Sequence, residues 1–169
     1  METSTLLIDD PVRITDFERL EDYLRAYLED ERFASEYPAA YARWLEASAM
    51  LYGGDVSEGI FAAGPKAREA LAAFASVLAG GYRPLALSPG SDASTRARLA
   101  AWIQSHRQAL GEARCELLEA LLQYWRAIND VPRRHAQDAH DVGDELRWED
   151  ARRVVILTAL VMVEIDRSF

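Results

Sequence analysis

Several residue types are scarce in this 169-residue chain, and each scarcity excludes a class of structure. The chain has one cysteine, Cys115, so no disulfide can form within it. A zinc site built from several thiolates is excluded for the same reason. We expect Cys115 to be a small buried apolar residue in a protein of a reducing compartment.

Segments that would direct the chain to a membrane are also lacking. Residues 1–9 have no basic region and only three consecutive large apolar residues, which does not fit a signal peptide. The longest apolar run, residues 154–163, is half as long as the ~20 residues that a helix needs to cross a bilayer. We therefore expect a cytoplasmic protein without a membrane partner.

Motifs for nucleotide binding and for nucleophilic catalysis are missing too. The glycines of residues 80–92, the longest predicted loop, do not follow a strand or match a phosphate-binding pattern. No serine nucleophile motif is present either, and we predict no cofactor. The 80–92 loop is still the best candidate for a functional connection between helices.

The negative charge, in contrast, is plentiful and unevenly distributed. The net charge is −9, and residues 1–60 contain 14 Asp or Glu against 5 Arg, whereas residues 61–169 contain 14 of each sign. All of the excess therefore lies in the first third of the chain. Such a field repels nucleic acid and anionic lipid and attracts basic proteins.

The apolar run of residues 154–163 predicts the centre of the fold. Its β-branched residues suit a strand as well as a helix, so the flanking residues decide. Asp144 is placed as an N-cap, and Arg167 at the other end complements a helix dipole. We predict one buried helix from Glu145 to Asp166.

Hydrophobic spacing predicts helices along the rest of the chain. An extended arm, residues 1–14, precedes a capping box at Thr15 that starts the first helix. The others begin at Pro38, at Gly64-Pro65 and at Ala93, with residues 56–63 left ambiguous. The sequence thus predicts an all-α, single-domain bundle of five to seven helices.

The longest predicted helix runs from Ala93 to Ile128, and Gly111 is the point at which it could divide. Asn129, Asp130 and Pro132 are expected to end it. All four tryptophans occupy helical positions and are predicted to be in the core: Trp44, Trp102, Trp125 and Trp148. The predicted inward stripe of the long helix comprises Leu99, Ile103, His106, Leu110, Ala113, Leu117, Leu121, Tyr124 and Ile128.

Histidine and aspartate cluster after this helix, a combination that can hold a divalent metal. The dipeptide His140-Asp141, preceded by His106 and followed by Asp166, resembles the residue order of helical HD-domain metal phosphohydrolases. The resemblance implies these four residues as metal ligands. However, a polar segment rather than an apolar helix precedes the pair here, and only 24 residues separate Asp141 from Asp166. We favour a solvated loop whose aspartates cap the next helix.

A second segment, Ala120-Leu121-Leu122-Gln123-Tyr124-Trp125-Arg126, has a different resemblance. It is similar to a helical segment of all-α immunity proteins from bacterial polymorphic toxin systems, in which alanine-leucine precedes an aromatic-tryptophan-arginine end. The resemblance implies a compact cytoplasmic protein that masks a toxin, and many such toxins are basic.

We therefore predict a binding protein rather than an enzyme. Glu18, Asp22 and Glu29 fall on the outer side of the first predicted helix and Asp30 follows them, so these four are expected to bind a basic protein partner, such as a toxin domain. Two alternatives stay open: a metal-dependent, HD-like hydrolase, and a structural module that associates with copies of itself.

Overall fold

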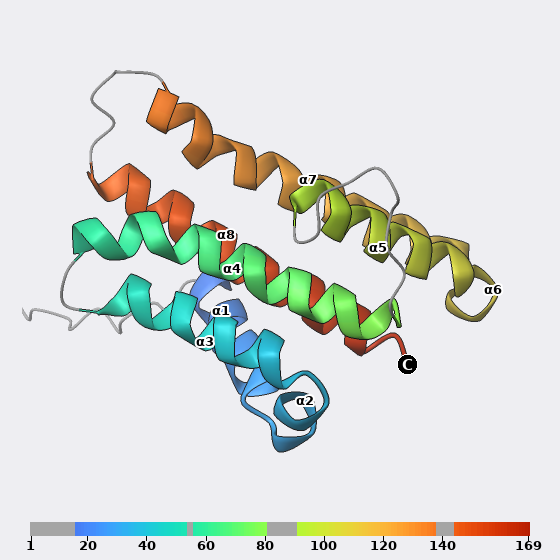
Figure 1. Cartoon of the computed structure of the whole chain (residues 1–169). Coiled ribbons are helices and arrows are strands. Elements are labelled where there is room, and N and C mark those ends of the chain that lie inside the picture. The colour runs from blue at the N-terminus through green and yellow to red at the C-terminus, as the bar shows by residue number, and fades with distance from the viewer. Residues whose placement is uncertain (1–15, 54–55, 81–90, 138–143) are drawn as a thin grey trace, which may run out of the picture.

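A computed structural model describes residues 16–53, 56–80, 91–137 and 144–169, and within these ranges it contains eight helices and no strand (Figure 1). The all-α prediction is confirmed. The helix count exceeds five to seven because two short helices were not anticipated. The helices are α1 (Asp16–Leu28), α2 (Glu31–Glu36), α3 (Pro38–Tyr52), α4 (Val56–Leu78), α5 (Asp92–Ser105), α6 (Arg107–Leu110), α7 (Glu112–Gln137) and α8 (Asp144–Asp166).

Helix α8 occupies the centre of the bundle, as predicted. It packs against α1, α3, α4 and α7, and in Figure 1 it runs between α4 and α7. Every residue from 154 to 163 is buried except Leu160, which is half-buried. The one polar side chain in this run, Thr158, accepts a hydrogen bond from Trp125 Nε1 at 3.0 Å. A helix segment that is buried on all sides has no face toward solvent and therefore needs no polar stripe, which explains the composition of α8.

The acidic N-terminal segment forms two helices rather than one. In α1, Leu24 and Leu28 are buried, while Phe17 at the first turn is 37% exposed. The chain turns at Glu29, and Asp30 then caps α2 by accepting a hydrogen bond from the Arg32 backbone N–H at 3.0 Å. This cap is the local reason for a new helix, because it satisfies a free N–H at the helix start.

Helix α4 begins earlier than predicted, since residues 56–63 join it and Pro65 lies inside it. Proline lacks an N–H and so leaves the Phe61 carbonyl without its helical donor. The face of α4 that packs on α3 and α8 offsets this loss, because it buries Ile60, Ala63, Ala67, Ala70, Leu71, Phe74 and Ala75. Helix α3 approaches so closely that a Cβ at Gly59 would lie 2.1 Å from the Met50 carbonyl oxygen.

The long helix predicted from Ala93 to Ile128 is three helices, with breaks at His106 and at Gly111. Gly111 adopts a φ of 79°, which favours glycine, so the predicted division there is confirmed. The predicted end at Asn129 to Pro132 is wrong, because α7 continues to Gln137. Asn129 is buried, and its side-chain amide donates to the Trp125 carbonyl at 2.8 Å instead of ending the helix.

The two breaks also change which side of α7 faces inward. The predicted inward residues Ala113, Leu117 and Tyr124 are exposed. The buried residues of this part of α7 are Cys115, Leu118, Leu122 and Trp125. A stripe extrapolated from α5 assumes an unbroken helix, and the turns at His106 and Gly111 shift the helical phase. The predicted burial of Cys115 is confirmed.

The predicted core tryptophans are confirmed, since Trp44, Trp102 and Trp125 are buried and Trp148 is half-buried. Trp44 Nε1 donates to the Val155 carbonyl at 3.3 Å and Trp148 Nε1 to the Leu51 carbonyl at 3.0 Å, so both join α3 to α8. None of the described helices is both long and apolar enough to cross a membrane. The 1–14 arm and most of the 80–92 loop lie outside the described residues.

Candidate partner-binding surface

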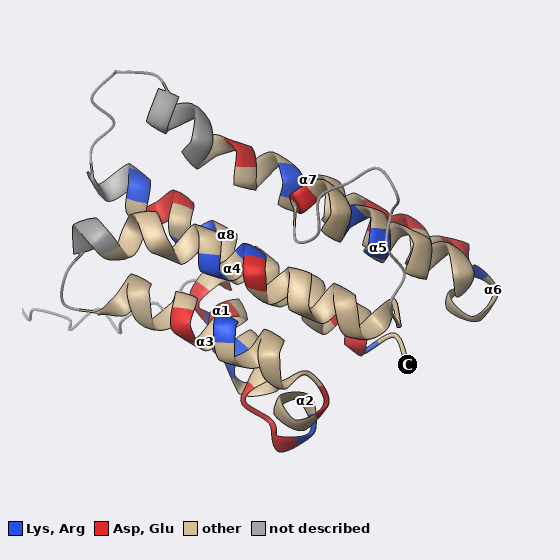
Figure 2. Cartoon of the chain, viewed as in Figure 1, with Lys and Arg blue, Asp and Glu red and all other residues tan. Residues whose placement is uncertain are grey.

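The four acidic residues predicted to bind a partner are all exposed. Glu18, Asp22 and Glu29 lie on α1 and in the turn that follows it, and Asp30 precedes α2. Figure 2 shows acidic segments around α2 and the turn before it. Between residues 16 and 36 the chain contains eight Asp or Glu and three Arg. Local charge density in this segment is therefore strongly negative.

Two of the three arginines in this segment point toward the rest of the protein. Arg25 donates to the Ser48 hydroxyl at 2.9 Å and its guanidinium lies 5.7 Å from the centre of the Trp44 ring. Arg32 binds the carboxylate of Asp166 on α8. Because these cations are used within the fold, they neutralise little of the exposed acidic surface. Both arginines also form solvent-exposed ion pairs within the segment, Arg25 with Glu29 at 3.9 Å and Arg32 with Glu36 at 3.1 Å, and exposed pairs of this kind are weak.

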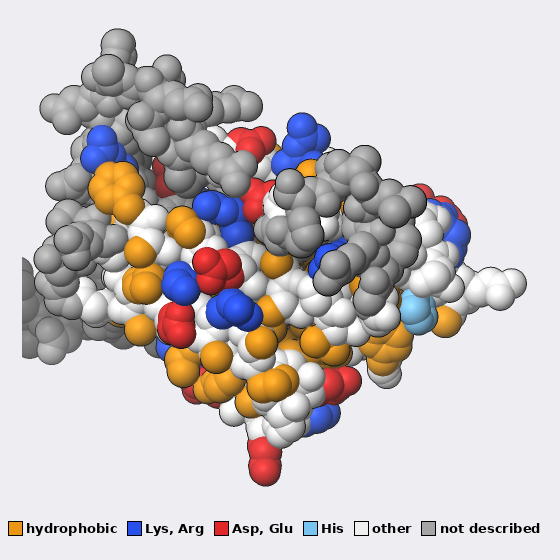
Figure 3. Space-filling view, viewed as in Figure 1, with side chains coloured by type: hydrophobic (Ala, Val, Ile, Leu, Met, Phe, Trp, Pro, Cys, Tyr) orange, Lys and Arg blue, Asp and Glu red, His pale blue; other side chains and the backbone are white. Residues whose placement is uncertain are grey.

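The face formed by α3 and α4 is different, because its charges of both signs pair with each other. Lys66 lies 3.4 Å from Glu46 and 3.2 Å from Glu69, and Arg43 lies 3.6 Å from Glu69. In Figure 3 cationic and anionic side chains adjoin at the centre of this face, among apolar ones. The surplus of negative charge is thus a property of α1 and α2.

Glu21 is the exception among the acids of α1, since it faces the core. Its carboxylate lies 2.7 Å from Arg152 Nη2 of α8. The Glu21 side chain is 14% exposed and that of Arg152 is 15% exposed. It also accepts a hydrogen bond from the Tyr52 hydroxyl. Burial, aided by this bond, raises the pKa of Tyr52 to about 12. Glu21 therefore anchors α1 to α3 and α8 and is no part of the binding surface.

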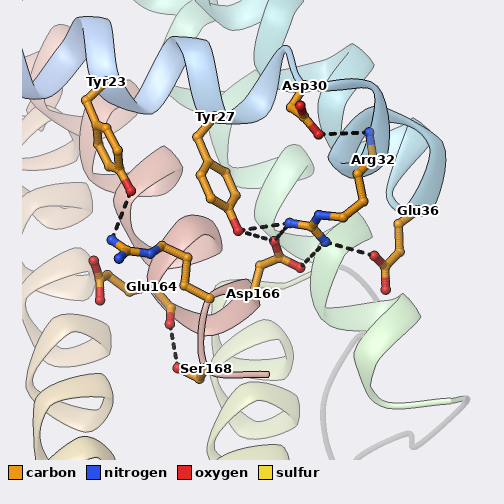
Figure 4. Close-up of polar contacts among 9 residues, drawn as sticks. Tyr23, Tyr27, Asp30, Arg32, Glu36, Glu164, Asp166 and Ser168 are labelled. Carbon is orange, nitrogen blue, oxygen red and sulfur yellow. Dashed lines mark hydrogen bonds and ion pairs between the residues drawn. The ribbon is translucent and has the colours of Figure 1, made fainter.

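A second polar anchor joins α2 to the last turn of α8 (Figure 4). Arg32 Nη1 donates to Asp166 Oδ1 at 3.2 Å, Arg32 Nη2 donates to Oδ2, and the Tyr27 hydroxyl donates to Oδ2 at 2.6 Å. The Asp166 side chain is 3% exposed and that of Arg32 is 53% exposed. A carboxylate at a helix C-terminus is opposed by the helix dipole, and Arg32 compensates for this.

The pKa of Asp166 reflects these contacts. Burial raises the pKa of this carboxyl, but hydrogen bonds from Arg32 and Tyr27 outweigh burial and hold the pKa below its usual value. Burial and the bond to Asp166 raise the pKa of Tyr27 to about 12. Asp166 is therefore ionised and fully bonded at neutral pH.

These contacts bear directly on the four predicted metal ligands. Asp166 is occupied by Arg32 and Tyr27, so this carboxylate is not available to a metal in the folded arrangement. His140 and Asp141 lie outside the described residues. Among the residues that the structure describes, no group of three or more His, Cys, Asp or Glu is placed to hold a metal ion.

His106, the remaining predicted ligand, ends α5 and packs at the boundary of the core. Its ring stacks on that of Trp102 with centres 4.4 Å apart, and Nδ1 lies 2.9 Å from the Trp102 carbonyl oxygen. The ring of Phe169 meets it edge-on at 5.6 Å. These contacts explain a histidine at this position by packing and capping.

A depression of about 370 Å³ lies between α5 and α7. Four of its seven lining residues are apolar and Glu119 is the one carboxylate among them: Ala93, Arg96, Ala97, Ala100, Glu119, Leu122 and Gln123. Glu119 is already bonded to Gln104 at 2.7 Å and to Arg107 at 3.3 Å. This arrangement lacks a free acid and base pair facing the depression.

Arg32 and Arg152 are the residues that sequence reasoning missed. Arg32 pairs with Asp166, 134 positions away, and Arg152 pairs with Glu21, 131 positions away. The sequence holds a partial signal for Arg32. Asp166 lies at the C-terminus of an apolar helix, where the helix dipole is negative, so a nearby cation is needed. Nothing in the sequence specifies which of 19 basic residues supplies it.

Comparison of the chain with protein-family models, with curated proteins and with solved structures finds no match. The function is therefore argued from the surface itself.

Proposed function

We propose that this protein is an immunity-type inhibitor that binds a basic protein, a bacterial toxin domain, through the exposed acidic side of α1 and α2. The observation that supports the proposal most is the exposure of Glu18, Asp22, Glu29 and Asp30, together with the inward use of Arg25 and Arg32. An acidic surface of this kind steers a basic partner toward it and raises the association rate.

Asp30 has a different role from the other three. Its carboxylate caps α2, so its substitution is expected to disturb α2 as well as binding. Glu18, Asp22 and Glu29 are therefore the better probes of partner binding. The polar anchors at Glu21 and Asp166 hold both helices on the core and leave the acidic side facing solvent.

The metal-dependent hydrolase is the weaker candidate. It requires Asp166 as a ligand, and that carboxylate already receives three hydrogen bonds from Arg32 and Tyr27. A metal ion would have to compete with Arg32 and Tyr27 for this carboxylate, whose side chain is only 3% exposed.

The test starts from the gene beside the one that encodes this protein. We expect its product to be basic, to stop growth when expressed alone, and to be neutralised by co-expression of the wild-type protein. The triple variant Glu18→Lys, Asp22→Lys, Glu29→Lys should lose most of the neutralisation. A matched variant with the same change of charge elsewhere, Glu46→Lys, Glu69→Lys, Glu112→Lys, should keep it, since these three are exposed but lie on α3, α4 and α7.

A neighbouring gene product that neither inhibits growth nor binds the wild-type protein would contradict the proposal. So would equal loss of neutralisation in both triple variants, because the effect would then follow net charge and not the α1–α2 surface.

A further inference from the structure

Helix α7 has a second apolar face that the described part of the chain does not cover. Its buried residues, Cys115, Leu118, Leu122 and Trp125, pack toward α5 and α8. On nearly the opposite side, about 160° around the helix at 100° per residue, lies a stripe of apolar residues at alternating steps of four and three. The stripe comprises Ala113, Leu117, Ala120, Tyr124, Ala127 and Val131, of which Val131 is half-buried and the others are exposed.

This outer stripe is larger than isolated exposed side chains would give. Leu117 is 44% and Tyr124 is 55% exposed, and half-buried Leu121 and Ile128 extend the stripe along one flank. From Ala113 to Val131 it runs for about 27 Å. No charged residue interrupts it, and its 4-3 spacing is that of a helix that packs against another helix.

We infer that the outer stripe of α7 is the contact surface of a homodimer, in which two copies of α7 pack antiparallel about a twofold axis. The inference goes beyond the proposed function and does not depend on it.

The sizes of the side chains favour a second copy in this orientation. Antiparallel packing centred near residue 122 places Leu117 opposite Ala127 of the second copy and Tyr124 opposite Ala120. The end layer then pairs Val131 with Ala113, so each large residue meets an alanine and the two stripes interdigitate. Parallel packing would instead place tyrosine on tyrosine and alanine on alanine. A twofold contact requires such self-complementarity.

Charge complementarity favours the same orientation. Residues 112–122 of α7 contain three Glu and one Arg, whereas residues 123–137 contain three Arg and one Asp. Antiparallel packing brings the acidic half of each α7 toward the basic half of the other and opposes the two helix dipoles.

The dimer would leave the acidic surface free. Helix α7 lies along one edge of the molecule and α2 along the opposite edge (Figure 1). Each copy in the dimer could therefore still bind a basic partner.

Sedimentation velocity of the purified full chain over a wide concentration range tests the inference. We expect a monomer–dimer equilibrium, and we expect Leu117→Glu and Tyr124→Glu each to raise the dissociation constant by at least about ten-fold, because two carboxylates would face an apolar contact. Phe61→Glu and Val77→Glu are matched controls on α4, at 62% and 52% exposure, and should dimerise as the wild type does. Circular dichroism should report wild-type melting temperatures for the four variants.

The orientation is tested by disulfide trapping. A mixture of the Ala120→Cys protein with the Tyr124→Cys protein should form a cross-linked dimer, while the Ala120→Cys protein alone should not. Native Cys115 is fully buried and does not compete.

A wild-type monomer at every concentration would overturn the inference, as would a dimer that persists in both α7 variants. Efficient cross-linking of Ala120→Cys with itself would overturn the antiparallel arrangement. A monomer that loses its basic partner on Tyr124→Glu would assign the stripe to that partner instead of a second copy.

Discussion

Helix α8 and the α1–α2 pair share one apolar core but differ in how much their attachment to it depends on ion pairs. The central part of α8 is apolar and buried, so the hydrophobic effect holds it in place. This effect scales with the apolar area removed from water and is not directional. Helices α1 and α2 bury only a few side chains of their own and are attached to α8 through Glu21–Arg152 and Arg32–Asp166. Stability thus depends mostly on α8, and surface charge depends on α1–α2, so most substitutions should affect one without the other.

The largest expected effect comes from placing a charge in α8. Leu157 is 6% exposed and packs in the core, so Leu157→Asp introduces an unpaired buried carboxylate. The cost is several kcal/mol against a total stability of about 5–15 kcal/mol, and we expect loss of the cooperative thermal transition. Circular dichroism melting measures this.

Leu160→Asp is the matched comparison on the same helix. Leu160 is half-buried, so its carboxylate can reach water and the variant should keep a cooperative transition at a lower temperature. Equal melting of wild type and Leu157→Asp would refute the central position of α8.

The junction between the two regions should show an intermediate effect. Asp166→Asn removes the charge that binds Arg32 and weakens the bond to Tyr27, at an expected cost of about 1–3 kcal/mol in the free energy of unfolding. The loss stays below that of a fully buried pair because the Arg32 side chain is 53% exposed and can be solvated. Urea denaturation measures the difference.

Glu36→Gln is the matched control, because Glu36 binds the same arginine at 3.1 Å but is itself 52% exposed. Its cost should be below about 0.5 kcal/mol. Comparable losses in both variants would mean that burial of Asp166 contributes nothing to the anchor.

The same junction predicts a dependence on pH. Because the pKa of Asp166 is lower in the folded protein than in the unfolded chain, its stabilising contribution is complete above about pH 4 and is lost as pH falls through the folded pKa. The difference in unfolding free energy between wild type and Asp166→Asn should therefore shrink below about pH 4. A difference that is constant from neutral to acidic pH would contradict the ionised pair.

The contrast between regions also explains what the sequence could predict. Local patterns identify α8 from its apolar run and α3 from Pro38 at its start. The exposure of Glu18, Asp22 and Glu29 follows from the helical period alone. These features depend on neighbours in sequence, where patterns are informative.

Features that depend on distant contacts were not predictable in the same way. The inward side of α7 follows from how α5, α6 and α7 turn at His106 and Gly111, so a continuous stripe gave the wrong face. The resemblance to HD-domain hydrolases implied Asp166 as a metal ligand, and the sequence does not reveal that its partner is Arg32, 134 positions away. Whether residues such as Pro65 end a helix depends on the apolar packing around them, here against α3 and α8.

The claim that α1 and α2 form the surface for a basic partner is tested most directly by association kinetics. The measurement is the association rate of the neighbouring-gene product, at low and at high salt, with three proteins. They are the wild type, the α1–α2 triple variant (Glu18→Lys, Asp22→Lys, Glu29→Lys) and the matched triple variant on α3, α4 and α7. We predict a rate about ten-fold or more lower for the α1–α2 variant at low salt, a difference that narrows as salt screens the field, and a much smaller change for the control. The melting temperature of each triple variant is measured alongside, because Glu46 and Glu69 pair with Lys66 and Glu112 pairs with Arg107. Exposed pairs contribute about 1 kcal/mol or less each, so we expect both variants to remain folded. An association rate that changes neither with the α1–α2 substitutions nor with salt would contradict the claim that α1 and α2 form the surface for a basic partner.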